Sequence, residues 1–367
     1  MSNEKRAIDD LVNVLDYEVE SALHMELPYW NYLATGAGDG QGVIQNSRIW
    51  DSYKILPRIL RGISHPDLSV NVLGRIWEHP IGLAPVASHG LYDLNGEITT
   101  QEGSQNCGST LQLSTHSTFG IEDFSKSTNY PWWFQLYIHR NRSVTSDLLE
   151  RAIVGGAEAI VLTVDTPVAG YRDLDRRTIS NASARLTPGQ PDSQYPNLVG
   201  LERYSDERPR HMKVLDPVLD PSIHWKDLEW LVSTSRVPVI VKGITHPDDA
   251  QLALKCGVQG LIVSNHGGRN LDGAVTAAEQ IRIIRDKIGD KPLLLTDGGI
   301  RRGSDIFKAI ALGANAVLVG RPYIWGLSLY GAKGVQRVVE ILRTELETTM
   351  ILSGTRSTSD ISFDYLA

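Results

Sequence analysis

The chain has 367 residues, enough for one large α/β domain or two domains of average size. Hydrophobic residues make up 41% of it and charged residues 22%, which is typical of a globular protein and excludes a disordered one. The formal net charge of −7 provides no overall field that attracts nucleic acid. Cys107 and Cys256 lie far apart without metal-ligand spacing, which excludes a disulfide scaffold or a zinc module.

Neither end of the chain predicts export or membrane insertion. Residues 1–15 are charged and lack the apolar stretch of a secretory signal. No uninterrupted apolar run approaches the ~20 residues that a membrane-spanning helix needs. The last three residues, Tyr365-Leu366-Ala367, differ from the Ser-Lys-Leu signal for peroxisomes. We therefore expect a cytoplasmic protein with no membrane or nucleic-acid partner.

In chain order, residues 1–75 come first and predict a helical extension, with Ile8–Leu23 as its clearest helix. Short aliphatic runs then recur and stop at polar residues. Such runs are typical of strands that are buried on both faces of a parallel sheet. The predicted strands are Ile81–Ala87, Ser109–Ser114, Trp133–Ile138, Ala159–Val164, Pro238–Val241, Gly260–Val263, Pro292–Leu295 and Ala316–Val319.

Amphipathic stretches with helical spacing separate these strands. This alternation favours an α/β fold of the (β/α)₈ TIM-barrel class, with residues 76–367 as the barrel domain. An open doubly wound sheet is the competing fold, but no G-x-G-x-x-G motif follows the first strand. The predicted helices are Val144–Ala152, Pro247–Lys255, Val275–Lys287, Gly303–Ala311 and Val335–Leu352.

Residues 178–221 interrupt the alternation between the fourth and fifth predicted strands. The segment is rich in Pro, Ser, Asp and Arg and has no sustained periodicity. A loop of this length inside a compact domain is typically a functional lid or a disordered segment. We treat it as a lid-like insertion, in which Tyr195 and Tyr204 are candidates to close over a bound ligand.

Almost every predicted strand ends on a polar residue. One such residue alone is usually a cap or part of a turn, but a buried ring of them lowers stability unless a ligand binds there. In a (β/α)₈ barrel the active site forms at the C-terminal ends of the strands, so we expect a ligand site at this end. The polar residues at or just after these ends are Ser114, Gln135, Tyr137, Thr163, Asp165, Lys242, Ser264, His266, Asp297 and Arg321.

The last two predicted strands are followed by glycine and arginine, in Asp297-Gly298-Gly299-Ile300-Arg301 and Gly320-Arg321-Pro322. Glycine lets backbone N–H groups approach an anion closely, and a helix N-terminus favours negative charge. Either motif alone could be only a tight turn. Loops after strands 7 and 8 are, however, the usual phosphate site of this fold. Together the two motifs predict a phosphate-bearing ligand.

The sixth predicted strand is followed by the segment Ser264-Asn265-His266-Gly267-Gly268-Arg269. An imidazole whose pKa lies near neutrality can accept a proton at working pH. The planar guanidinium three residues later suits a carboxylate. The structural alternative is a histidine that only holds a glycine-rich turn. We interpret His266 and Arg269 as residues of the active site, and we expect no metal.

These motifs resemble those of the FMN-dependent L-2-hydroxy acid oxidases and dehydrogenases, such as glycolate oxidase, lactate oxidase and mandelate-oxidising enzymes. The resemblance runs from about Tyr29 to Ser353 in collinear order. Its most specific parts are the Ser-Asn-His-Gly-x-Arg block and the Asp-Gly-Gly-x-Arg-Arg-Gly block. The other matching segments are Tyr32 with Ala34–Ala37, Leu162–Pro167, Val241–Gly243 and Gly320–Pro322.

The resemblance implies oxidation of a 2-hydroxy acid to the 2-oxo acid by bound FMN. His266 would be the base, and Asp165 would pair with the imidazolium that forms. Arg269 and Arg172 would hold the substrate carboxylate, helped by the hydroxyl of Tyr32. His266 is needed whether the α-hydrogen leaves as a proton or as a hydride. It would remove the carbon-bound proton in one scheme and the hydroxyl proton in the other.

The resemblance also implies the contacts of the flavin, the electron acceptor that protein side chains cannot supply. Tyr137 would hydrogen-bond the substrate oxygen, and Lys242 would stabilise negative charge on the reduced flavin. The other implied contacts are Ser114, Gln135, Thr163 and Ser264 on the ring, Pro85, Val86 and Ala87 on its other side, Asp297 on the ribityl chain, and Gly299, Arg301, Gly320 and Arg321 on the phosphate.

Two positions depart from the pattern of glycolate oxidase. His116 stands where that enzyme has tryptophan, and Tyr171 stands where it has another arginine. If His116 faces the substrate, the smaller imidazole leaves room for a longer side chain than that of glycolate. The alternative is that His116 faces solvent or a backbone carbonyl. The stretches Val168–Asp173 and Lys242–Pro247 look nearer to lactate oxidase, so we expect a lactate-like or larger substrate, aromatic ones included.

We expect O₂ as the electron acceptor, with release of H₂O₂, and a homo-oligomer, a tetramer by resemblance. A quinone or a cytochrome is the alternative acceptor. The polar insertion 178–221 lacks an apolar anchor, and the extension is too short for a haem domain, so both features favour oxygen. A phosphate-binding barrel without redox chemistry would leave Lys242, His266 and Arg269 unexplained. The intact set of His266, Arg269, Arg172 and Tyr32 argues against a flavin-binding protein that has lost catalysis.

Overall fold

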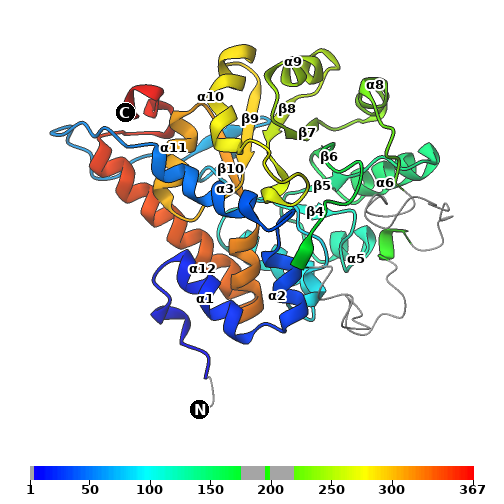
Figure 1. The fold of residues 1–367 in the computed structure, drawn as a ribbon, viewed down its shortest axis with the longest axis horizontal. Helices are drawn as coiled ribbons and strands as arrows, with labels where there is room; N and C mark the ends of the chain where they lie inside the picture. The colour runs from blue at the N-terminus through cyan, green and yellow to red at the C-terminus, as the bar shows by residue number, and fades with distance from the viewer. Residues whose placement is uncertain (1–3, 175–194, 199–218) are drawn as a thin grey trace.

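The computed structural model describes residues 4–174, 195–198 and 219–367 (Figure 1). Most of the predicted insertion 178–221, including Tyr204, therefore lies outside the described residues. Eight parallel strands close in the order β10-β3-β4-β5-β6-β7-β8-β9, which confirms the predicted (β/α)₈ barrel. Their bounds are β3 Ile81–Leu83, β4 Leu111–Ser114, β5 Trp132–Leu136, β6 Ile160–Thr163, β7 Val239–Ile244, β8 Gly260–Val263, β9 Leu293–Asp297 and β10 Ala316–Val319.

The helices surround the barrel on its outside (Figure 1). The predicted helices Pro247–Lys255 and Gly303–Ala311 have the predicted bounds. The α-helices are α1 Val14–His24, α2 Leu27–Ala34, α3 Gln41–Ser52, α4 Gly96–Asn106, α5 Ile121–Lys126, α6 Arg142–Val154, α8 Trp225–Thr234, α9 Pro247–Lys255, α10 Ala277–Ile288, α11 Gly303–Ala311 and α12 Arg321–Ser353. Short 3₁₀ helices are η1 Ile8–Asp10, η2 His89–Leu91, η3 Pro196–Leu198, η5 His266–Gly268, η6 Thr358–Asp360 and η7 Phe363–Tyr365.

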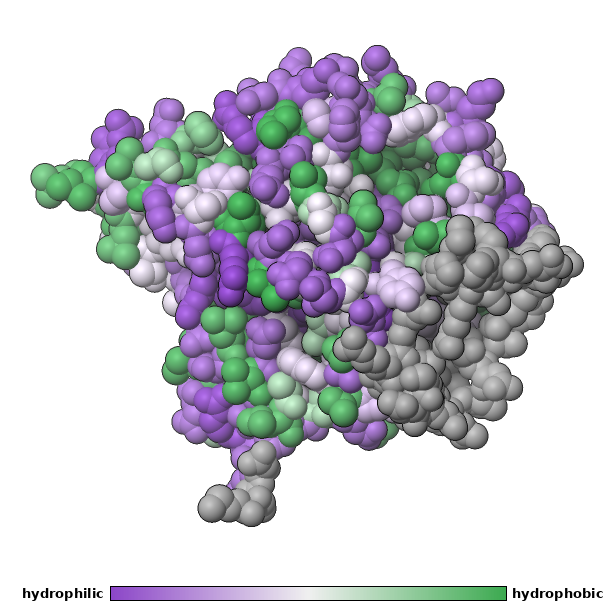
Figure 2. Space-filling view, in the orientation of Figure 1, coloured by the Kyte–Doolittle hydropathy of each residue, from purple (hydrophilic) through white to green (hydrophobic). Residues whose placement is uncertain are grey.

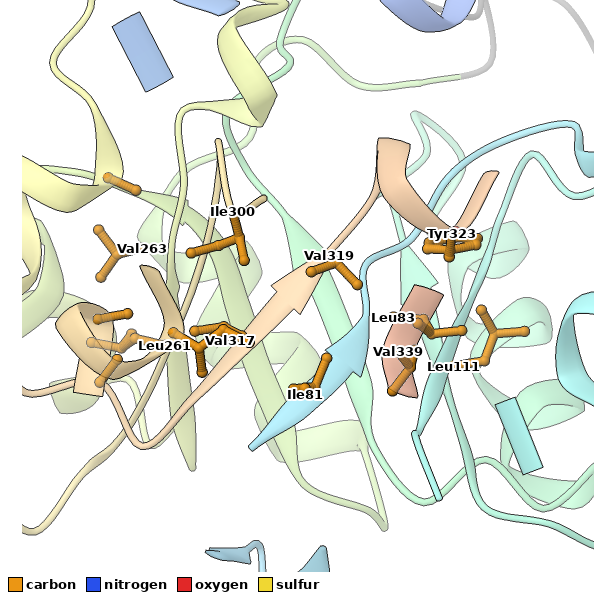
Figure 3. Packing of buried hydrophobic residues seen from close by; sticks show 14 of the residues in the cluster. Ile81, Leu83, Leu111, Leu261, Val263, Ile300, Val317, Val319, Tyr323 and Val339 are labelled. Atoms are coloured by element: carbon orange, nitrogen blue, oxygen red, sulfur yellow. The ribbon is translucent and has the colours of Figure 1, made fainter. Parts of the chain in front are cut away.

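The hydrophobic core has two layers because side chains alternate along each strand. On β10, Ala316 and Leu318 point into the barrel and belong to an inner cluster. Val317 and Val319 belong to the outer cluster, between the strands and the helices. Figure 3 shows this outer layer, in which residues of β3 and β10 lie near Tyr323 of α12. Both faces of the strands are therefore buried, as the aliphatic runs predict.

An antiparallel hairpin closes the N-terminal end of the barrel. Its strands are β1, Val70–Val72, and β2, Arg75–Trp77. The side chains of Val72 and Trp77 join the inner cluster, and the Trp77 and Trp133 ring centroids lie 5.5 Å apart. The predicted extension 1–75 is therefore helical only in part, since its last residues form a strand that covers apolar side chains of the barrel.

Two predicted helices begin far from their predicted first residues, whereas α6 and α10 begin within two residues of theirs. The helix predicted at Ile8–Leu23 begins at Val14, because Asn13 and Asp16 form a capping box that starts it there. The helix predicted at Val335–Leu352 belongs to α12, which begins at Arg321 and bends at Gly331, where φ is +58°. The first part of α12 is buried almost all round, so it lacks the amphipathic pattern that predicts a helix.

The loop that follows α3 projects from the molecule (Figure 1). Figure 2 shows apolar side chains at the tip of this projection. Leu56, Ile59 and Leu60 are 55%, 76% and 97% exposed. No helix in the described part of the chain has the length and hydropathy that a membrane-spanning segment needs.

Candidate active site

One pocket lies at the C-terminal ends of the barrel strands. It is lined by every residue that the sequence predicts for the site, except Asp165 and Ser264, which contact the lining residues His266 and Lys242. The predicted residues that line it are Tyr32, Pro85, Val86, Ala87, Ser114, His116, Gln135, Tyr137, Thr163, Arg172, Lys242, His266, Arg269, Asp297, Gly299, Arg301, Gly320 and Arg321.

His266 sits in a strained turn after β8. Its φ is +58°, an uncommon value for a residue with a side chain, and Gly267 and Gly268 also have positive φ. The backbone N–H of His266 donates to Ser264 Oγ at 3.0 Å. The turn directs the imidazole toward β6, where His266 Nδ1 lies 2.8 Å from Asp165 Oδ1.

A glycine on β7 makes room for Asp165. Gly243 has a φ of +107°, and a Cβ at this position would lie 2.6 Å from the Cβ of Asp165. The register between β7 and β8 shifts at this point, between Lys242 and Ile244. The sequence Val241-Lys242-Gly243 therefore places a lysine beside the imidazole–carboxylate pair and leaves space for the carboxylate.

Burial and neighbouring charges set the protonation of the pair. Burial lowers the pKa of His266 below its usual 6.5, opposed by Asp165 and assisted by Lys242 and Arg172. Burial alone would raise the pKa of Asp165, but the charges of His266 and Lys242 and the hydrogen bonds from His266 and Thr166 lower it. His266 is therefore a neutral imidazole near pH 7, beside an ionised carboxylate.

Lys242 and Asp297 form a buried ion pair at the floor of the pocket. Lys242 Nζ lies 3.3 Å from Asp297 Oδ2 and 3.1 Å from Ser264 Oγ. Burial alone would lower the pKa of Lys242, but the charges of Asp297 and Asp165 raise it, so the ammonium stays charged. Asp297 Oδ1 is buried and has no hydrogen-bond partner among the described residues. A buried oxygen in this state can accept a hydrogen bond from a ligand.

A row of polar side chains crosses three neighbouring strands. Ser114 Oγ donates to Gln135 Oε1 at 3.3 Å, and Gln135 Nε2 donates to Thr163 Oγ1 at 3.1 Å. All three residues are buried, and Thr163 pairs in register with Lys242. The row therefore continues to the lysine and offers a flat polar ligand a line of donors and acceptors.

On the opposite side, α12 fixes the segment that leaves β3. The hydroxyl of Tyr323 donates to the backbone carbonyl of Ala84 at 2.8 Å. The same hydroxyl lies 3.2 Å from Nε2 of the buried His89. Pro85, Val86 and Ala87 follow Ala84 directly and are held at the edge of the pocket.

Two arginines hold the end of α2 over the pocket. Arg269 Nη1 donates to the backbone carbonyls of Tyr32 at 2.9 Å and Thr35 at 3.0 Å, and its guanidinium lies 5.2 Å from the centroid of the Tyr32 ring. Arg321 donates to the carbonyls of Leu33 and Thr35. Arg172 Nε donates to the backbone carbonyl of Arg269 at 3.1 Å. The N-terminal extension thus completes the site by supplying Tyr32.

The loop after β9 and the start of α12 form a positively charged cradle. Gly298 and Gly299 have positive φ, and a Cβ on Gly299 would lie 1.7 Å from a backbone oxygen. Burial and the charges of Arg269 and Arg301 lower the pKa of Arg321 well below its usual value. The Arg301 guanidinium lies 4.8 Å from the Trp325 ring centroid, and its Nε lies 3.9 Å from Glu18. Buried guanidinium groups beside a helix N-terminus fit a phosphate.

His116 is 3% exposed and belongs to the lining of the pocket. Its ring centroid is 5.5 Å from that of Tyr137 and 4.5 Å from that of Tyr195. Burial lowers its pKa to about 4, so the imidazole is neutral. It therefore does not face solvent, which was one of the two alternatives to a substrate contact. Burial also raises the pKa of the Tyr137 phenol, which keeps it protonated.

Several residues of the site carry no signal in the sequence. Thr166 and Asn270 adjoin predicted residues, but only the folded chain shows that their side chains contact the His266–Asp165 pair. Among the described residues, no group of three His, Cys, Asp or Glu is placed to hold a metal ion. The lining residues that the sequence prediction lacks are Leu33, Ala84, Gly267, Gly298, Ile300, Leu318, Val319 and Pro322.

Comparison with known proteins identifies the family. The family model of the FMN-dependent dehydrogenases matches residues 22–367. The chain belongs to this family. The family's cofactor, FMN, fits the pocket, because the cradle suits one phosphate, the polar row suits a flat ring, and Asp297 Oδ1 can accept from the ligand.

Two curated relatives in this family cover nearly the whole chain. An L-lactate oxidase from Nostoc sp. is 38% identical over 371 residues, which cover 98% of this chain and 99% of the relative. The 2-hydroxyacid oxidase 1 of Homo sapiens is 36% identical, over 94% of this chain and 93% of its own.

Solved structures of FMN-dependent dehydrogenases have the same fold. A lactate oxidase from Pediococcus acidilactici superimposes with a TM-score of 0.88 at 33% identity, covering 99% of this chain and 95% of that one. A soluble mutant of the membrane-associated (S)-mandelate dehydrogenase from Pseudomonas putida gives a TM-score of 0.87 at 31% identity, covering 97% and 99%.

Proposed function

We propose that this protein oxidises an L-2-hydroxy acid to the 2-oxo acid, with FMN as cofactor and O₂ as the electron acceptor. The substrate loses two hydrogens and O₂ becomes H₂O₂. The observation that carries the proposal is the His266–Asp165 pair. Its histidine lines one pocket together with the guanidinium groups of Arg172 and Arg269 and the phenols of Tyr32 and Tyr137. Oxidation of a 2-hydroxy acid requires cations that bind the substrate carboxylate and a base beside the α-carbon. The guanidinium groups and His266 meet these two requirements.

The side chains divide the work by charge and position. Arg172 and Arg269 bind the substrate carboxylate, and the hydroxyl of Tyr32 adds a donor. His266 Nδ1 is engaged with Asp165, so Nε2 is the nitrogen that takes the proton. Asp165 then stabilises the imidazolium. The phenol of Tyr137, which its raised pKa keeps protonated, donates to the substrate oxygen.

Bound FMN supplies the two-electron acceptor that no side chain can provide. Lys242 would provide a buried positive charge beside the bound cofactor and so favour its acceptance of electrons. The residues proposed to hold the cofactor are Pro85, Val86, Ala87, Ser114, Gln135, Thr163, Lys242 and Ser264 around the ring, Asp297 on the ribityl chain, and Gly299, Arg301, Gly320 and Arg321 on the phosphate.

Oxygen is the acceptor that the relatives favour. The curated relatives reported above are oxidases and align over almost the full chain. A quinone or a cytochrome, the alternative acceptor, is not favoured by these relatives. A phosphate-binding barrel without redox chemistry would use the cradle but would have no use for the buried Lys242–Asp297 pair.

The substrate side chain is proposed to lie against His116, Tyr137 and Tyr195. These rings pack together at one wall of the pocket, and the neutral His116 adds no charge there. Such a wall suits an uncharged side chain of lactate size or larger, including an aromatic one.

The assembly and the location are proposals as well. We propose a homo-oligomer, and the resemblance to the family implies a tetramer. The exposed Leu56, Ile59 and Leu60 support a subunit contact, because burying this tip removes it from water. Light scattering tests this. The proposed location is the cytoplasm.

Purified protein tests the reaction. Heat-released ligand should have the mass of FMN, and lactate with O₂ should give one H₂O₂ for each 2-oxo acid. His266→Ala should retain FMN and lose about 10²–10⁴-fold in flavin reduction. An adenine-containing cofactor, or rapid reduction of the variant's flavin, would refute the proposal.

A further inference from the structure

Two side chains without a role so far contact the His266–Asp165 pair. Thr166 Oγ1 lies 3.1 Å from Asp165 Oδ1 and 3.3 Å from His266 Nδ1. Asn270 Nδ2 lies 2.7 Å from Thr166 Oγ1 and 2.8 Å from the backbone oxygen of Asp165. Thr166 is 7% exposed, so water has little access to its hydroxyl.

Chemistry fixes the direction of each hydrogen bond in this group. The backbone oxygen of Asp165 can only accept, so the Asn270 atom beside it is the amide nitrogen, which can only donate. Thr166 Oγ1 therefore accepts from Asn270. Its single proton is left to donate to Asp165 Oδ1, the same oxygen that accepts from His266 Nδ1.

We infer that Thr166, oriented by Asn270, is a positioning residue for the base of the proposed reaction. The Thr166 hydroxyl, bound to Oδ1 of Asp165, fixes the direction in which that oxygen accepts from His266 Nδ1. The carboxylate in turn keeps the histidine proton on Nδ1 and leaves Nε2 able to accept. The inference rests on the proposed function, because it assigns a role only if His266 acts as a base.

The hydroxyl also affects the charge that His266 experiences. Thr166 and His266 both donate to Oδ1 of Asp165. When the Thr166 hydroxyl is removed, one donor no longer offsets the negative charge of this carboxylate, so the carboxylate attracts a proton onto the imidazole more strongly. Besides Asp165, the charged groups that act on His266 are Lys242 and Arg172. The Tyr137 phenol contacts the Thr166 hydroxyl. Neither the Lys242 nor the Arg172 charge changes in a Thr166 variant, but Tyr137 loses its hydrogen bond to the Thr166 hydroxyl when that hydroxyl is removed. The pKa of His266 should therefore rise when the hydroxyl is removed.

Thr166→Val keeps the shape of the side chain and removes the hydroxyl. Thr166→Ser keeps the hydroxyl and tests whether it alone restores the behaviour. Thr145→Val is the matched control, since Thr145 is also buried and bonds to the backbone N–H of His139, outside the pocket. Flavin absorbance and thermal unfolding establish that each variant is folded and loaded with FMN.

Two readouts are compared. Steady-state oxidation of a 2-hydroxy acid in the presence of O₂ gives kcat and KM as functions of pH, and anaerobic mixing gives the rate of flavin reduction. ¹⁵N NMR of protein labelled at histidine gives the pKa and tautomer of His266 without turnover, with His266→Gln to assign its signal. Thr166→Val should lower kcat about tenfold, leave KM within about twofold, and move the His266 titration to higher pH. Thr166→Ser and Thr145→Val should match the wild type.

The outcomes separate the inference from the proposed function. If Thr166→Val has the kcat, pH profile and His266 titration of the wild type, Thr166 has no positioning role. If Thr166→Ser loses as much of kcat as Thr166→Val does, altered packing explains the loss, because serine keeps the hydroxyl. The inference is then wrong. If the wild type reduces no flavin with any 2-hydroxy acid, the proposed function fails, while the NMR titration still decides whether Thr166 acts on His266.

Discussion

At the scale of single residues, His266 has both a strained backbone and a perturbed charge. Its positive φ is uncommon for a residue with a side chain, and the turn that imposes it brings Nδ1 to within 2.8 Å of Asp165 Oδ1. Burial outweighs the attraction of that carboxylate and lowers the pKa of the imidazole. The imidazole of His266 therefore stays neutral, and able to accept a proton, to a lower pH than an ordinary histidine does.

This shift predicts the pH dependence of the reaction. The base must be neutral, so flavin reduction should be complete at pH values above the pKa of His266 and should fall as pH drops through it. Because that pKa lies below its usual 6.5, the acid limb should have its midpoint below pH 6.5. Stopped-flow reduction across pH 4–9 measures it. A midpoint above pH 7 would contradict the assignment of an imidazole with a lowered pKa.

The wall at His116 predicts how substrate preference can be changed. His116→Trp should fill space beside Tyr137 and Tyr195 and favour glycolate over larger acids. The difference in activation free energy between the two substrates, calculated from the ratio of their kcat/KM values, should change by about 1–3 kcal/mol. This is the usual effect of one methylene in an apolar pocket. Competing substrates from glycolate to mandelate give this ratio in both proteins. An unchanged ranking would show that the substrate does not reach this wall.

At the scale of elements, the loops that follow the strands form the site. Gly299, in the loop after β9, shows how little space these loops leave for a side chain. Gly299→Ala would place a Cβ 1.7 Å from the backbone oxygen of Asn46. We expect it to weaken FMN binding and lower the free energy of unfolding by about 1–3 kcal/mol. Fluorescence titration with FMN and thermal unfolding measure the two effects.

Gly289→Ala is the control for Gly299→Ala. Gly289 has a similar φ, +76° against +74°, but a Cβ at this position would meet nothing within 4 Å beyond its chain neighbours. It should share the backbone strain and leave FMN affinity unchanged. Equal FMN affinity in both variants would mean that the loop after β9 does not form the phosphate site.

Element identity could be predicted from the sequence better than element ends. The aliphatic runs predict each barrel strand because both faces are buried, and α9 and α11 follow from their amphipathic pattern. The first turns of α12 are missed because burial on nearly every side removes that pattern. The pocket gathers the predicted residues because the C-terminal ends of the strands meet at one end of the barrel. Thr166 and Asn270 are missed because sequence does not show side-chain direction.

At the scale of the whole molecule, the pocket needs both the N-terminal extension and the barrel. Tyr32 comes from α2, and Arg269 and Arg321 from the barrel hold the end of that helix through backbone carbonyls. The division into an extension, 1–75, and a barrel, 76–367, remains a proposal about folding units. The chemistry itself depends on their contact, so activity should be a property of the intact chain.

Anaerobic mixing of the intact, FMN-loaded protein with L- and D-2-hydroxy acids tests the central claim most directly. The L-acid should bleach the visible flavin absorbance within the mixing experiment, and the D-acid should leave it unchanged. Readmitted air should then restore the absorbance and release H₂O₂. Flavin that stays oxidised with every L-2-hydroxy acid would contradict the proposed reaction, and flavin that stays reduced in air would exclude O₂ as the acceptor.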